Sequence, residues 1–211
     1  MRFQAYQVRN AYRWAVATTS TELKTTENAR KKLLVQAYRL ADLDSEYQVT
    51  WRLLLRYGRF FTRPNVLARS SPYRGRHATS RAVAAAVAVD HSELAYAEGV
   101  ATVSEEHLVR HRAWNITASG VAVDYTTTTP GKAYLGVPFT SAYLSKARYA
   151  DGSPFSVWDQ RIAARFLEEG LPSSLLLDVG SGVPVDWLDA LAERLGHVSD
   201  ASIRSGGSHE G

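Results

Sequence analysis

Two N-terminal segments carry apolar residues at helical spacing. In residues 27–42 the apolar positions recur every three or four residues while the basic ones fall elsewhere, and Thr25 or Thr26 is suited to cap the first turn. Residues 47–57 predict a second helix, which Gly58 ends. The inward-facing positions of the two helices are Ala29, Leu33, Ala37, Leu40, Ala41, Trp51, Leu54 and Leu55.

The middle of the chain favours a buried helix followed by strands. Residues 80–90 are rich in Ala and Val, and the Ala content favours a helix. Residues 94–103 and 112–118 have strand character, and Gly120 turns the chain into a third, alternating strand at 121–126. The pattern further predicts a fourth strand at residues 133–139 and helices at residues 155–169 and 185–195.

These elements predict an α+β fold. A small antiparallel sheet packs with a central helix that begins at Ser80, and helices flank it on the N- and C-terminal sides. We expect a basic helical segment at residues 1–64, a Pro-, Gly-, Ser- and Arg-rich linker at 65–79, an α+β core with C-terminal helices at 80–198 and a disordered tail at 199–211.

Charge is distributed unevenly along the chain. The chain has 25 Lys and Arg and 21 Asp and Glu residues, of which 16 basic and 5 acidic ones fall in residues 1–82. The first part therefore carries about +11 and the remainder about −7. The basic part could attract a polyanion, or its charges could form solvated helix faces and internal ion pairs.

Composition narrows the chemistry. The chain has no Cys, which excludes disulfides, thiolate nucleophiles and Cys-based zinc sites. The N-terminus lacks a secretory pattern, and no stretch approaches about 18 apolar residues, so we expect a cytoplasmic protein without a membrane span. His107 and His111 lie four residues apart, but no third ligand accompanies them, and we expect no metal or cofactor.

Short motifs follow one another between residues 80 and 139. They are Ser80 at the start of the predicted helix, Tyr96-Ala97-Glu98-Gly99, Ala113-Trp114, Asp124-Tyr125-Thr126 and Tyr134-Leu135-Gly136. Their order and spacing resemble the transglutaminase-like branch of the papain-like cysteine enzymes and a similar pattern in small bacterial and phage proteins. There a Cys opens the helix, followed by Tyr-x-Glu-Gly, His-Ala-Trp, Asp-Pro-Thr and Tyr-x-Gly. The resemblance covers less than half of the chain and implies a papain/transglutaminase-like core.

The chemistry of that family explains its layout. A thiol at a helix N-terminus gains thiolate character, a His on a neighbouring strand transfers the proton, and a carboxylate on the next strand fixes the imidazole tautomer. By resemblance these three positions fall on Ser80, Arg112 and Asp124. Trp114 would pack beside them, as part of a binding site or of the core.

Two of the three positions depart from the family pattern. The Ser80 hydroxyl is far harder to ionise than a thiol, and Arg112 stays protonated and cannot act as a base. His111 lies one residue earlier, so on a regular strand its side chain should face away from Ser80. Ser80 is then most simply an N-cap, and Asp124 either has a role near the turn or pairs with Arg112.

These departures favour a catalytically degenerate transglutaminase/papain-like protein that acts by binding a macromolecular partner, in a phage or bacterial accessory role. One alternative is a Ser-dependent hydrolase or acyltransferase that uses Ser80, His111 and Asp124. Another is a nucleic-acid-binding protein that uses a basic patch interleaved with aromatic residues, unless those rings belong to the core and the Arg residues to its rim. The patch consists of Arg52, Arg56, Arg59, Arg63, Arg74 and Arg76.

A Gly-rich segment follows near the C-terminus. Residues 177–182, Leu-Asp-Val-Gly-Ser-Gly, look like the first motif of Rossmann methyltransferases. Val183 and Pro184 replace the small residue expected next, and too few residues follow to complete a βαβ unit. The simpler interpretation is a loop that leads into the predicted helix at 185–195.

Overall fold

The computed structural model describes residues 20–42, 47–63, 73, 79–102, 109–126, 131–146, 155–184 and 187–188. Within these residues the chain forms one six-stranded sheet, five α-helices and a 3-10 turn, η1 (Ser173–Leu175). The helices are α2 (Ser20–Asp42), α3 (Gln48–Tyr57), α4 (Ser80–Asp90), α5 (Ser141–Lys146) and α6 (Gln160–Glu168). The predicted α+β class is confirmed.

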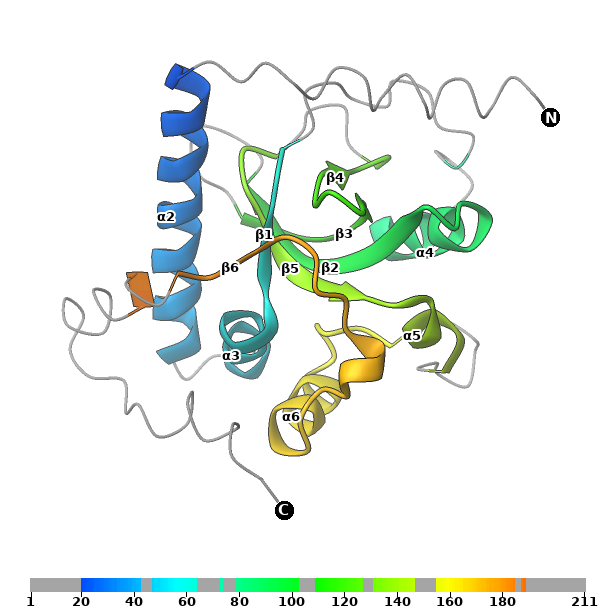
Figure 1. Cartoon of the computed structure of the whole chain (residues 1–211). Coiled ribbons are helices and arrows are strands. Elements are labelled where there is room, and N and C mark those ends of the chain that lie inside the picture. The colour runs from blue at the N-terminus through cyan, green and yellow to red at the C-terminus, as the bar shows by residue number, and fades with distance from the viewer. Residues whose placement is uncertain are drawn as a thin grey trace, which may run out of the picture.

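The sheet is antiparallel and curled (Figure 1). Its strands are β1 (Arg59–Phe61), β2 (Leu94–Thr102), β3 (Val109–Thr117), β4 (Ala122–Val123), β5 (Tyr134–Phe139) and β6 (Ser181–Gly182), in the order β4-β3-β2-β5-β1-β6. The curl is closed by a parallel bridge between Thr62 and Val121, where Thr62 N–H donates to Gly120 O and Thr62 O accepts from Ala122 N–H, both at 2.9 Å.

Strand alternation divides the buried side chains into two layers. The helices cover one face, where Tyr96, Val100, Leu135 and Val137 share a core with side chains of all five α-helices. The other face lines the inside of the curl. We call its residues the inner cluster: Phe61, Ala97, Ala101, Trp114, Ile116, Ala122 and Tyr134.

The inner cluster requires a glycine at position 136 of β5. A Cβ at Gly136 would lie 2.7 Å from Trp114 Cη2 and 2.8 Å from Glu98 O. The indole of Trp114 therefore occupies the space that any larger residue at this position on β5 would need. Because protein interiors are close-packed, Gly136 and Trp114 fit only as a pair.

The helix boundaries follow the sequence pattern in part. The prediction for residues 80–90 coincides with α4, and Gly58 follows α3 as expected. α2 begins seven residues before the predicted start at Glu27, and α6 begins five residues after the predicted start at Phe155. There the N–H of Arg161 donates to Asp159, which caps α6 and fixes its start.

Residues 59–61, which lie in the segment 1–64 expected to be helical, form β1 inside the sheet, and their pairing with β5 and β6 explains the difference. The N-terminal helices pack on the same core as β2 and β5, so the predicted N-terminal segment contributes to the main fold. The linker prediction at residues 65–79 falls mostly outside the described residues, as does the helix at 185–195; the tail at 199–211 lies wholly outside them. None of the described helices combines the length and apolar character needed to cross a membrane.

Candidate functional site

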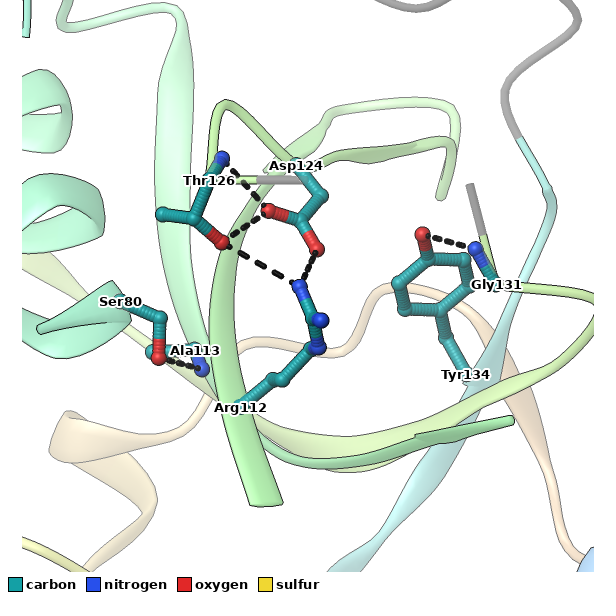
Figure 2. Close-up of polar contacts among 7 residues, drawn as sticks. All are labelled: Ser80, Arg112, Ala113, Asp124, Thr126, Gly131 and Tyr134. Carbon is teal, nitrogen blue, oxygen red and sulfur yellow. Dashed lines mark hydrogen bonds and ion pairs between the residues drawn. The ribbon is translucent and has the colours of Figure 1, made fainter. Parts of the chain in front are cut away.

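Ser80 is the first residue of α4 and faces the neighbouring strand β3. Its Oγ accepts a hydrogen bond from the N–H of Ala113 at 3.2 Å. The helix cap is instead Thr79, which has an extended backbone and accepts from the N–H of Ala82 at 3.2 Å. The expectation that Ser80 caps the helix was therefore wrong by one residue. Ser80 joins the start of α4 to β3, as Figure 2 shows.

Arg112 on β3 forms an ion pair with Asp124, which directly follows β4. Arg112 Nη1 lies 3.2 Å from Asp124 Oδ2, and the side chains are only 15% and 1% exposed. Thr126 completes the arrangement, because its N–H and Oγ1 both donate to Asp124 Oδ1, at 2.8 and 2.6 Å. In Figure 2 the Arg112 side chain extends toward Asp124 and away from Ser80. The carboxylate thus has a charged partner on Oδ2 and neutral partners on Oδ1.

Tyr134 is a buried residue of the inner cluster with a polar hydroxyl. Its Oη accepts from the N–H of Gly131 at 2.8 Å (Figure 2). Burial and, next, the negative charge of Asp124 raise the pKa of the Tyr134 phenol well above its ordinary value. Tyr134 therefore stays protonated at physiological pH.

His111 lies on the opposite face of β3, where its imidazole stacks on Trp158. The ring centroids are 3.4 Å apart and the planes differ by 10°. Tyr47 and Trp51 contact the same imidazole edge-on. Burial lowers the pKa of His111. Among the described residues no hydrogen bond or ion pair links His111 to Ser80 or Asp124, so these three residues are not assembled as a triad.

Trp114 is a core residue. It is 1% exposed, and its ring meets Phe61 and Tyr134 edge-on within the inner cluster. Its Nε1 has no hydrogen-bond partner among the described residues. At 1% exposure its indole offers almost no surface to a partner, and the assignment of Trp114 as a binding residue stays a prediction.

Three residues of the predicted basic patch have partners within the fold. Arg52 Nε donates to Ala41 O in the last turn of α2, and Arg56 Nη1 donates to Leu167 O in the last turn of α6, both at 3.1 Å. Such carbonyls at helix C-termini lack helical partners and attract cations. Arg59 pairs with Asp178 at 2.8 Å.

Two of the aromatic residues beside this patch, Phe60 and Phe61, are buried. Phe60 and Phe61 are 2% and 0% exposed, and the Tyr57 hydroxyl accepts from the N–H of Leu171. Arg63 is exposed, whereas Arg74 and Arg76 lie outside the described residues. The rings of Phe60 and Phe61 belong to the core, and the nucleic-acid-binding alternative stays a prediction.

The sequence reasoning gave no role to Glu98, which is fully buried on β2. Its carboxylate accepts from Ser156 Oγ at 2.5 Å, from Tyr96 Oη at 3.2 Å and from the N–H of Val157 at 3.4 Å. Burial raises the pKa of Glu98, while these hydrogen bonds and Arg81 act in the opposite direction. A lone acidic residue in an otherwise apolar strand was the signal that could have identified it.

Comparison with known proteins gives no relative: no family model, no curated protein and no solved structure matches this chain.

Proposed function

We propose that this chain is a catalytically degenerate member of the transglutaminase/papain-like group that acts by binding a macromolecular partner. One observation carries the proposal. The position that would hold the catalytic imidazole is Arg112, and its guanidinium is paired with Asp124, the residue that would orient that imidazole. Ser80, at the position of the nucleophile, begins the helix that contacts the same strand.

The chemistry of these groups argues against turnover. A guanidinium remains protonated at any physiological pH, so it cannot remove a proton from the Ser80 hydroxyl. That hydroxyl already accepts a hydrogen bond from Ala113. The nearest residue with a titratable imidazole along the strand, His111, is stacked on Trp158 on the other face. A serine nucleophile without a base is a poor catalyst.

The absence of Cys makes the ancestral arrangement directly testable. In the variant S80C the introduced thiol is the only one in the chain. In S80C/R112H a His stands where the family has one, with Asp124 available to orient it. We expect the thiol pKa, measured by the pH dependence of iodoacetamide alkylation, to be about 1 unit or more lower in S80C/R112H than in an unperturbed Cys of about 8.5.

R112H alone is the control for folding of the strand, and S80C/R112A reports the effect of removing the cation without adding an imidazole. S80C/R112H must first show the same free energy of unfolding as R112H. If its thiol then titrates at the ordinary value of about 8.5, the result counts against the family geometry. Labelling of the unmodified chain by a serine-reactive phosphonate, lost in S80A, would overturn the proposal that the protein is catalytically inactive.

A further inference from the structure

A cleft of about 520 Å³ lies beside the end of α3. Residues from α3, β1, η1 and β6 and their flanking segments line it, and none of them belongs to the group around Ser80, Arg112 and Asp124. Its volume falls in the range of small-molecule sites. The cleft is also where two features of the sequence meet, because the basic patch contributes Arg56 and Arg59, and the Gly-rich segment contributes Asp178 and Gly182.

Both guanidinium groups keep donors for a further acceptor. Arg56 donates one N–H, from Nη1, to Leu167 O. Its guanidinium lies 5.1 Å from the ring centre of Tyr57. Arg59 uses Nη2 for Asp178. A guanidinium has five N–H donors, and its planar fork matches the oxygens of a carboxylate or phosphate.

The Gly-rich segment leaves room for the Arg59 side chain. β6 pairs with β1 so that Gly182 is opposite Arg59. A Cβ at Gly182 would lie 3.0 Å from Arg59 Nη1, so the guanidinium occupies the space above this glycine. Gly180 has φ of 92°, a conformation that favours glycine, and it turns the chain between Asp178 and β6. The backbone thus positions both Arg59 and its carboxylate partner at the cleft.

The Asp178 carboxylate occupies a position at Arg59 that the oxyanion of a ligand could take instead. Its side chain is 91% exposed and forms an ion pair with Arg59 at 2.8 Å. Exposed ion pairs contribute little to stability, so an anion can replace this carboxylate at small cost. The remaining wall of the cleft is apolar and comes from Leu55, Leu176, Leu177, Val183 and Leu188.

We propose that this cleft binds a small organic oxyanion, a phosphate or carboxylate carried on an apolar body. The charged group contacts the guanidinium groups of Arg56 and Arg59, displacing Asp178, and the apolar body lies against the leucine wall. The proposal is independent of the degenerate site and of its family assignment.

The test is titration of the full chain with phenyl phosphate, inorganic phosphate and phenol, followed by isothermal calorimetry and by amide NMR shifts of Gly180, Ser181 and Gly182. We expect phenyl phosphate to bind more tightly than either fragment. R59Q should weaken its binding about tenfold or more, which corresponds to the loss of a charged hydrogen bond. D178N should strengthen binding severalfold, because it frees Arg59 and removes a negative charge.

R63Q is the matched control, because Arg63 follows β1 and is exposed but does not line the cleft. Its affinity for phenyl phosphate should equal that of the unmodified chain. Benzoate in place of phenyl phosphate identifies which oxyanion is preferred. The proposal is overturned if phenyl phosphate at millimolar concentration causes no amide NMR shift. It is also overturned if R59Q and R63Q weaken phenyl phosphate binding equally, or if D178N weakens that binding. Tighter binding of an oligonucleotide than of phenyl phosphate, with equal losses of oligonucleotide affinity in R59Q and R63Q, would assign the basic residues to a nucleic-acid surface instead.

Discussion

The guanidinium of Arg112 and the carboxylate of Asp124 meet at 3.2 Å, with the carboxylate almost fully buried. Buried charges are tolerated when they are paired and hydrogen-bonded, and Thr126 supplies the further hydrogen bonds. The pair therefore fixes the segment that follows β4 against β3. It is a stabilising contact at the position where the proposed family has catalytic groups.

Removal of one partner of this pair should destabilise the protein. In R112A the carboxylate of Asp124 would stay buried without its cation, and we expect the free energy of unfolding to fall by about 3 kcal/mol, measured by urea denaturation. The double variant R112A/D124A removes both charges and should lose much less than the sum of the single variants. Additive losses would show that the two side chains do not act as a pair.

Glu98 should make stability depend on pH. Because its pKa in the folded protein lies above the ordinary value of 4.5, the folded state holds this proton more tightly than the unfolded chain. The stability that Glu98 adds to the folded state is therefore lost as the pH rises from about 4.5 through the raised pKa. The free energy of unfolding of the E98Q variant, measured by urea denaturation across this range, should lack that decline.

The exposed Glu169, paired with Arg165 on the surface, provides the control. If E98Q and the unmodified chain show the same slope, Glu98 does not titrate differently in the folded state.

His111 should titrate below pH 6.5, the ordinary value for an imidazole, because burial lowers its pKa. The folded state then binds this proton less readily than the unfolded chain, so the stability contribution is present above pH 6.5 and is lost as the pH falls through the folded pKa. NMR titration of the imidazole protons measures the midpoint directly. In W158L the stacked ring is gone, and the midpoint should move toward 6.5; a midpoint above 6.5 in the unmodified chain would contradict the prediction.

Gly136 should not tolerate even a methyl group. The Cβ of G136A would overlap the Trp114 indole and the Glu98 carbonyl, and we expect a loss of about 1–3 kcal/mol in the free energy of unfolding. G170A is a useful comparison, because Gly170 has φ of 80° but its Cβ would meet only Tyr57 Oη, at 3.8 Å. It isolates backbone strain, of about 1 kcal/mol. The double variant G136A/W114F should recover part of the loss if the clash with the indole is its cause.

Elements with a long, uniform pattern could be predicted from sequence. α4 is an Ala- and Val-rich run with a cap before it, and both of its ends were predicted correctly. β1 and β6 are three and two residues long, too short for periodicity to identify, and they are strands only because β5 and β1 pair with them. Tertiary pairing of this kind leaves no local signal.

In the candidate site, too, some features could be predicted from the sequence and others could not. Strand alternation was enough to predict that His111 and Arg112 point to opposite faces, as their contacts show. The choice between Thr79 and Ser80 as the cap depends on backbone angles that two adjacent hydroxyl residues do not reveal. The engagement of Arg52 and Arg56 by helix carbonyls likewise depends on where α2 and α6 end in space.

The bridge between Thr62 and Val121 has a consequence for self-association. Exposed strand edges offer unpaired amides and carbonyls on which copies of a protein can add to one another and aggregate. On the β4 side, Thr62 already occupies hydrogen-bonding groups of Gly120 and Ala122. At the other end of the sheet, β6 is two residues long, too short a template for the orderly stacking that seeds fibrils.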